Sequence, residues 1–304
     1  MAVASRAARN ASIKHSRYHS RLGIVMAKEL SDFIWGKPGL GVLIGIALFV
    51  VPIALAFTRM VGGGNAHYEP SLYPTMEDSD MRNVLSDGLW MASFFISMMG
   101  GLLTGQNETK GTWESMLITS ARRWDIVGGK LLAFGLVWSC LSIIQATTLA
   151  VLSHISAVVV LCPFLSYFHP DMAFFAKLAL VLTFGGCSTY ALFSYFNARP
   201  VRYTYRFAIV TFAIIELICR HWPITWPLLG FVPLMNTNNG LSAIFGALPY
   251  DRRVESPMPH FGAPWDHPGF WIVCVAGGII TTLILAALTV RNLRAGMPLP
   301  NTAK

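Results

Sequence analysis

The sequence predicts an all-α membrane protein that crosses the bilayer six times. Three observations support this prediction: a strongly apolar composition, six apolar segments, and basic residues that gather in alternate connections between those segments. Of the 304 residues, 54% are hydrophobic and 12% are charged, and the mean hydropathy is +0.53. A soluble domain has about a quarter of its residues charged. Because no polar stretch is long enough to bury a core of its own, we expect a single membrane domain.

The six apolar segments are long enough, or nearly so, to cross the hydrocarbon core, which takes about 20 helical residues. The predicted spans are residues 39–58, 86–104, 131–153, 173–196, 205–221 and 269–290. The second and fifth are short as apolar runs and reach this length only through flanking Ser, Gly, Thr and Trp residues. Residues 39–304 therefore form the transmembrane domain, and residues 1–38 form a basic tail followed by an interfacial helix.

Basic residues indicate the orientation of these spans. If both termini are cytoplasmic, the inside segments contain 17 of the 23 Lys and Arg residues. This asymmetry is the one that the positive-inside rule describes. It also accounts for the net charge of +8 without a nucleic-acid partner. The predicted environment is the lipid bilayer of a bacterial inner membrane, crossed several times, with both termini on the cytoplasmic side.

Two further segments fit neither a loop nor a regular span. Residues 17–36 mix apolar and charged side chains as an amphipathic elbow helix at the cytoplasmic interface does, with Trp35 at headgroup depth. The alternative is an inward extension of the first span. Residues 223–248 are apolar but are interrupted by three prolines and by the polar run 236–240. Neither half can cross the bilayer, so we expect a re-entrant pair of short helices on the outer face.

The connection over residues 105–130 is the most informative part of the sequence. Gly111 permits a sharp turn, Thr112 is a suitable N-cap, and Glu114 complements the dipole in the first turn of a short helix. Its apolar side chains recur at helical spacing: Trp113, Met116 and Leu117. A helix of this kind can dock into a groove on a soluble partner. On physical grounds alone, a plain interfacial helix explains the pattern equally well.

The string ETKGTWESMLITSARRWDIVGGKLLAF within this connection closely resembles the signature of ABC-2-type ABC transporter permeases. That signature has an acidic residue, Gly-Thr, a second acidic residue, Leu, small residues, Arg, an apolar pair and a Lys. The resemblance implies that the loop is a cytoplasmic coupling helix resting on an ATPase subunit. The residues implied at this contact are Glu108, Gly111, Thr112, Trp113, Glu114, Leu117, Arg122, Arg123 and Lys130. Trp113 departs from the family pattern, in which smaller or aliphatic residues are common.

The chain has no phosphate-binding loop of its own. The nearest string is Gly128-Gly129-Lys130, which is followed by Leu131 instead of Ser or Thr and lacks the first glycine of the loop. We therefore expect no cofactor in this chain and no ATPase activity. The resemblance implies that a separate ABC ATPase subunit binds ATP and Mg²⁺, and that two permease chains, identical or related, assemble on two ATPases.

Few other residues suggest chemistry. Glu216 is the one carboxylate inside the apolar runs that define the predicted spans, and Arg220 follows it by one helical turn. A structural charge pair is favoured over a functional site, although charges inside a membrane are often functional. The cysteines lack the spacing of a metal site. His15 and His19 are four residues apart, a helical ligand spacing, but they lie in the basic tail, and no metal site is predicted. No arrangement of a nucleophile with a base is recognisable.

The leading interpretation is thus the permease subunit of an ATP-driven ABC transporter that works as an exporter. The alternatives are a secondary transporter driven by an ion gradient and a membrane anchor for a cytoplasmic complex. A secondary transporter is expected to have several ionisable residues deep in its spans and two related halves. The cargo is left open by the sequence.

Overall fold

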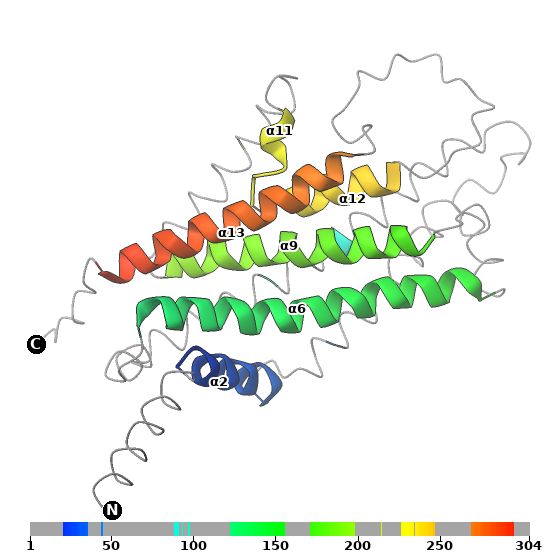
Figure 1. The fold of residues 1–304 in the computed structure, drawn as a ribbon. Helices are drawn as coiled ribbons and strands as arrows, with labels where there is room; N and C mark the ends of the chain where they lie inside the picture. The colour runs from blue at the N-terminus through cyan, green and yellow to red at the C-terminus, as the bar shows by residue number, and fades with distance from the viewer. Residues whose placement is uncertain are drawn as a thin grey trace, which may run out of the picture.

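The structure is a computed structural model, and every regular element in the part of the chain that it describes is an α-helix (Figure 1). The described residues are 21–35, 44, 88–90, 93, 97, 122–155, 171–197, 214, 226–233, 235–246 and 269–294. The helices are α2 (Arg21–Trp35), α6 (Arg123–His154), α9 (Met172–Asn197), α11 (Trp226–Leu229), α12 (Asn236–Gly246) and α13 (Phe270–Arg294).

Three of these helices are long and apolar enough to cross a membrane: Arg123–Leu152, Met172–Phe196 and Phe270–Leu293. They coincide with the predicted spans 131–153, 173–196 and 269–290, so the transmembrane character is confirmed for this part of the chain. The predicted spans 39–58, 86–104 and 205–221 lie mostly outside the described residues. The few described residues within them, among which are Ile44 and Ile214, are helical.

The helix α6 begins at Arg123, well before the predicted boundary at residue 131. Residue 131 marks the start of the apolar run that was predicted to cross the membrane, and the helix extends beyond that run. The helix itself starts at its cap, where the backbone N–H of Arg122 donates to Oδ2 of Asp125 at 3.0 Å. Hydrogen bonding at the cap, rather than hydropathy, therefore decides where this helix begins.

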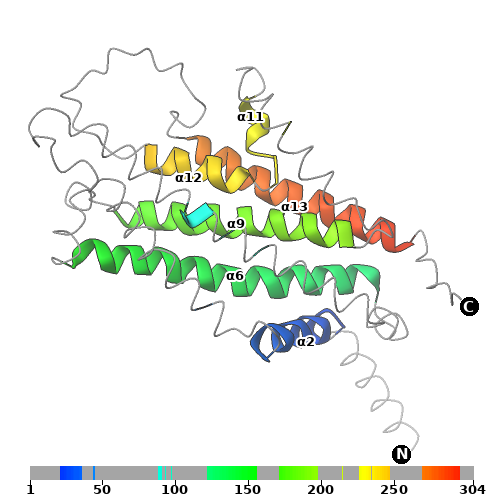
Figure 2. The ribbon, with the colours of Figure 1, turned by 180° about the vertical axis from the view of Figure 1, so that it is seen from behind.

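The helices α9 and α13 run in the same direction, and α6 runs against both of them (Figures 1 and 2). Leu149 near the end of α6 packs in one cluster with Phe174 near the start of α9. At the other end of the bundle, Ile126 near the start of α6 packs with Val290 near the end of α13. The chain that follows α9 must therefore run back along the bundle, from the end where α9 stops to the opposite end, where α13 starts.

The contact between α6 and α9 is built around aromatic rings. The rings of Phe134 and Tyr190 stack with centroids 4.0 Å apart. The indole Nε1–H of Trp138 donates to the backbone carbonyl of Leu182 at 2.6 Å. A Cβ atom at Gly186 would collide with the Trp138 ring. Glycine thus allows the indole to reach the backbone of the neighbouring helix.

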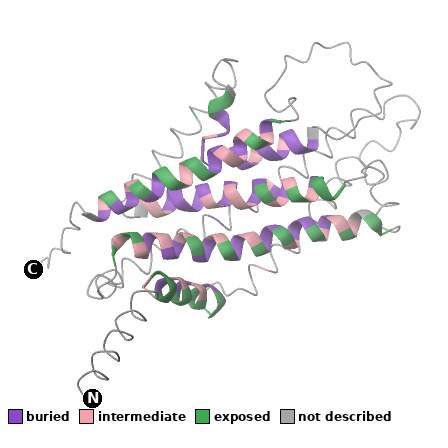
Figure 3. Ribbon diagram, viewed as in Figure 1, coloured by how far each residue is buried: buried purple, intermediate pink, exposed green. Residues whose placement is uncertain are grey.

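The outer surfaces of the long helices are apolar, and Figure 3 shows their exposed residues as stripes along the ribbons. Ile272 and Leu283 of α13 have 55% and 64% of their surface exposed. Leu132 and Ile143 give α6 a similar exposed side. Lipid chains are the natural neighbours for such faces on helices long enough to span a bilayer.

Candidate functional site

The start of α6 holds the part of the predicted coupling segment that the structure describes. Arg122 immediately precedes the helix, Arg123 is its first residue, and Lys130 lies two turns into it. The remaining predicted contact residues lie outside the described part of the chain: Glu108, Gly111, Thr112, Trp113, Glu114 and Leu117. The same holds for Glu216 and Arg220, so their suggested pairing is a prediction still.

Lys130 forms a buried ion pair with Glu29 of α2. The distance between Lys130 Nζ and Glu29 Oε1 is 3.8 Å. Both residues are largely removed from solvent, with 7% and 4% of their surface exposed. Burial raises the pKa of Glu29 above its ordinary value of 4.5, and the positive charge of Lys130 opposes that rise. Lys130, the last residue of the signature-like pattern, thus links α6 to α2.

Close backbone packing surrounds this ion pair. A Cβ atom at Gly129 would lie 2.7 Å from Cγ1 of Val25 and 3.3 Å from the backbone carbonyl oxygen of Leu22. Contacts that short are not tolerated, so a larger residue at position 129 would push α2 away from α6. Further along, Phe33 packs against Phe134 with ring centroids 6.2 Å apart. The helices α2 and α6 are therefore closely packed along most of α2.

The end of α13 completes the junction. Val25 of α2 and Val127 of α6 share one buried cluster with Val290 and Leu293 of α13. Three helices that are far apart in the sequence therefore meet next to the residue at which the signature segment enters α6. A displacement of the start of α6 would have to disturb both α2 and α13, because packed interiors transmit strain.

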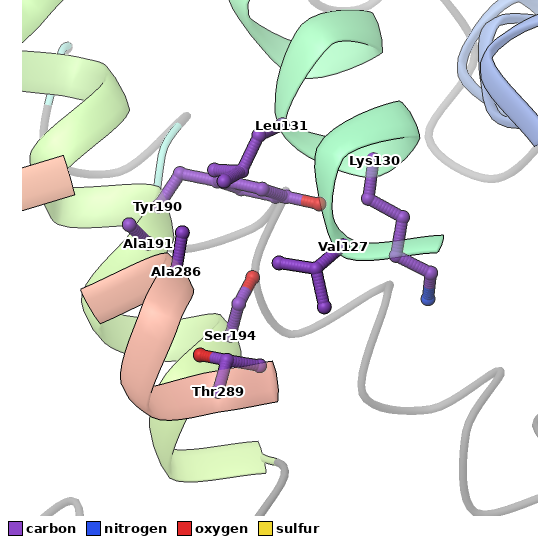
Figure 4. A pocket seen from close by; sticks show the side chains of 8 residues that line it. All are labelled: Val127, Lys130, Leu131, Tyr190, Ala191, Ser194, Ala286 and Thr289. Carbon is purple, nitrogen blue, oxygen red and sulfur yellow. The ribbon is translucent and has the colours of Figure 1, made fainter. Parts of the chain in front are cut away.

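A small pocket lies between α6, α9 and α13 just beyond this junction (Figure 4). Its polar lining includes Lys130, Tyr190, Ser194 and Thr289. The volume open to the centre of a water molecule is about 10 Å³, which is near the minimum for one water. The Ser194 hydroxyl has no hydrogen-bond partner among the described residues. The pocket thus fits a bridging water and is too small for a cargo molecule.

The two ends of the bundle differ in charge. The end with α2, the start of α6 and the end of α13 carries most of the described ionisable residues: Arg21, Lys28, Glu29, Asp32, Arg122, Arg123, Asp125, Lys130 and Arg291. The opposite end carries His154, Asp171 and Lys177. We call the first of these the basic end.

The segment predicted to be re-entrant lies in the other half of the bundle. It contains α11, a turn that includes Val232, and α12, which has 11 residues. At about 1.5 Å per residue α12 is too short to cross a bilayer. A Cβ atom at Gly230 would lie 2.9 Å from Val273 Cγ1, and Phe231 accepts a hydrogen bond from Thr281, near the middle of α13. The chain thus descends to mid-depth, and α12 leads back towards the start of α13.

The buried polar groups of this segment are matched to the long helices. The Asn236 Nδ2 group donates to Ser188 Oγ of α9 at 3.1 Å. The Thr281 hydroxyl of α13 donates to the carbonyl of Phe231 at 3.0 Å. A Cβ atom at Gly277 would collide with the carbonyl of Gly230. These partners were not foreseen from the sequence, in which the polar run 236–240 and the glycines of α13 were the only signals.

No protein-family model, curated protein or solved structure matches the chain. Any assignment of function therefore depends on the residues of the chain itself and on the contacts described above.

Proposed function

We propose that this chain is the membrane-spanning subunit of an ATP-driven ABC exporter of the ABC-2 type, powered by a separate ATPase subunit. The observation that carries the proposal is the position of the signature-like segment. It runs directly into the first turns of α6, where its last residue, Lys130, binds Glu29 of α2. A soluble subunit that pushes on this segment would act on three packed helices.

The directions of the described helices support six spans. Because α9 and α13 run the same way, the chain between them has to cross the membrane once more in the opposite direction. The α12 helix is too short for this crossing, whereas the predicted fifth span, 205–221, has a suitable composition. With the predicted spans 39–58 and 86–104, this return gives six crossings and both termini at the basic end.

The charge of the basic end supports a cytoplasmic position for the signature segment. Arg122 and Arg123 lie where this segment joins α6, and the exposed Arg291 lies near the end of α13. The positive-inside rule favours such residues on the cytoplasmic side. An ATPase works on that side, so Glu108 to Leu117 would be within its reach.

The mechanism we propose is mechanical. Closure of two ATPases around ATP displaces the coupling segment, and α6 moves with it because Arg123 to Lys130 belong both to that segment and to the first turns of α6. The motion reaches α2 through Glu29–Lys130 and through the close contact of Val25 with Gly129. It reaches α13 through the cluster that includes Val290. ATP and Mg²⁺ remain on the partner subunit.

The distribution of charge in the described spans argues against a secondary transporter. Between Lys130 and His154, α6 has no ionisable side chain except Cys140, and α13 has only Cys274 before Arg291. Proton and ion relays need carboxylates or histidines at membrane depth. A passive membrane anchor fits the charges equally well. It differs from a permease in that its partner's ATPase rate would not depend on it.

The decisive experiment combines purification with an activity measurement. The tagged chain is isolated in mild detergent from its native membrane, and the ATPase subunit is identified by its P-loop sequence. Glu114→Lys should reduce the retained ATPase or its turnover about tenfold or more, as expected when a contact worth about 1.4 kcal/mol is lost. Glu69→Lys, in the predicted outer loop, is the matched control and should behave as the wild type.

Two results would contradict the proposal. One is a wild-type chain that retains no P-loop ATPase. The other is equal behaviour of the Glu114→Lys and Glu69→Lys proteins. Sidedness gives an independent check: a membrane-impermeant maleimide should label Thr112→Cys in inside-out vesicles beyond the wild-type level, but not in intact spheroplasts.

A further inference from the structure

We propose that α2 binds anionic phospholipids of the cytoplasmic leaflet along the side that faces away from α6. This side is an outward stripe made of Ile24, Lys28, Ser31 and Trp35. The inference rests on the membrane orientation given under the proposed function, but it does not depend on the ATPase or on the cargo.

The contacts with α6 determine which side of α2 faces outward. Val25, Glu29 and Phe33 are buried at intervals of four residues, which places them on one side of the helix. Each has its own contact in the bundle: Val25 lies against Gly129, Glu29 pairs with Lys130, and Phe33 packs on Phe134. The helix therefore cannot turn about its axis without breaking all three contacts.

The outward stripe follows from that orientation. Its members are spaced by four, three and four residues, so they form a line roughly 130° around the helix from the buried side, at 3.6 residues per turn. Ile24 and Trp35 have 63% and 84% of their surface exposed, and Lys28 and Ser31 are exposed as well. Two large apolar side chains thus flank a lysine and a hydroxyl group.

The residues of the outward stripe also lie at different depths along α6. Val25 contacts α6 at Gly129, whereas Phe33 contacts it at Phe134, five residues further along. At a rise of 1.5 Å per residue, α2 descends about 7.5 Å along α6 between these two contacts. Lys28 is therefore closer to the cytoplasm than Trp35 is. This order matches a phospholipid monolayer, in which phosphates lie outside the layer that Trp prefers.

Charge identifies the kind of lipid. Residues 1–28 include six basic residues and no acidic one. The carboxylate of Glu29 forms an ion pair with Lys130. Asp32 is the one other carboxylate of α2. Arg122 and Arg123 add positive charge at the same end of the bundle. A basic amphipathic helix next to membrane spans is typical of proteins that attract anionic lipids, and each basic residue near the surface strengthens binding roughly fivefold.

The test is a lipid titration of the purified full-length chain, followed by native mass spectrometry. Phosphatidylglycerol and phosphatidylcholine with identical acyl chains are compared. The wild type should retain phosphatidylglycerol at least about fivefold more strongly than phosphatidylcholine. Lys28→Gln should lower that preference about fivefold, whereas Lys28→Arg should keep it. Lys177→Gln, at the opposite end of the bundle, is the matched control and should leave the preference unchanged.

Several outcomes would overturn the inference. Equal retention of the two lipids would do so, as would equal losses in the Lys28→Gln and Lys177→Gln proteins. Competition by inorganic phosphate at the lipid concentration would show an anion site rather than a lipid surface. A Lys28→Gln protein that keeps its phosphatidylglycerol but loses the ATPase subunit would assign the stripe to that protein partner. Loss of lipid preference with the ATPase retained supports the inference and leaves the proposed function unaffected.

Discussion

The two buried junctions of this bundle use different chemistry for the same task. At the basic end, α2 is held on α6 by an ion pair, Glu29–Lys130, next to a glycine contact. In the other half, the segment of α11 and α12 is held on α9 and α13 by neutral hydrogen bonds, such as the one between Asn236 and Ser188. Both junctions need glycine, because both bring backbones close together.

The difference between the junctions is one of depth. The ion pair lies near the cytoplasmic boundary that we propose, where the cost of desolvating a charge is lower than in the hydrocarbon core. The α12 segment reaches the middle of α9 and α13, where every unpaired polar group costs several kcal/mol and a charge costs more. The first junction should therefore respond to charge and pH, and the second to volume and hydrogen bonding.

The largest expected effect comes from volume in the second junction. Replacing Gly277 by Leu places a side chain where the carbonyl of Gly230 lies, and neither backbone can yield easily. We expect a loss of at least about 3 kcal/mol, at the upper end for overpacking, seen as a much lower yield of folded protein and a lower melting temperature in detergent. Gly23→Ala, which has no atom within 4 Å of the added Cβ, should be neutral or slightly stabilising. Wild-type stability of the Gly277→Leu protein would show that α11 does not rest on α13.

The second expected effect comes from charge at the first junction. Lys130→Met leaves the Glu29 carboxylate buried without its cation, and removing one partner of a buried pair costs about 3–5 kcal/mol. The Nζ–Oε1 distance of 3.8 Å is long, so we expect a value near 2 kcal/mol at neutral pH. The double variant Glu29→Gln with Lys130→Met should regain most of this loss. Failure of the double variant to recover would mean that the two side chains are not coupled.

The same pair predicts a pH dependence with a definite sign. Burial raises the folded-state pKa of Glu29 above its ordinary value of 4.5, so the folded protein binds this proton more tightly than the unfolded chain does. Stability should fall as the pH rises through the range above 4.5 and then level off. Lys130→Met should widen this range, since the opposing charge is gone, and Glu29→Gln should abolish the contribution. Melting temperatures measured between pH 5 and pH 8 would reveal the three profiles.

The parts of the fold that were predictable are those that depend on local sequence. The apolar runs around Trp138, Tyr190 and Cys274 identified three spans, since length and hydropathy alone determine whether a helix can cross a bilayer. The prolines and the polar run at 236–240 identified an interrupted segment, because they leave neither half of it long and apolar enough to cross a bilayer. The helix α6 extends beyond its apolar run to a cap at Arg122, whose backbone N–H donates to the Asp125 carboxylate.

The parts that were not predictable depend on how helices meet. The place of Lys130 at the ATPase contact follows from a resemblance and stays a prediction, and the structure adds its ion pair with Glu29. The burial of Glu29 had a signal in the sequence. Glu29 lies four residues after Val25 and four before Phe33, on the same side of α2 as these two apolar residues. Its partner could be identified only once α2 was docked on α6. Six of the predicted contact residues lie outside the described chain and are predictions still.

The smallest expected effect tests the neutral hydrogen bonds in the second junction. Ser188→Ala removes the partner of the Asn236 amide, and side-chain hydrogen bonds between membrane helices are worth about 0.6–1.7 kcal/mol. Ser139→Ala is the matched control, because the Ser139 hydroxyl donates only to the carbonyl of Gly135 in its own helix. We expect the first variant to unfold at a lower denaturant concentration than the second. Since neither pair carries a charge, the difference between them should also stay constant from pH 5 to pH 8. A difference that varied with pH would mean that an ionisable group outside the described residues reaches this depth, and the contrast between a charged end and a neutral interior would then fail.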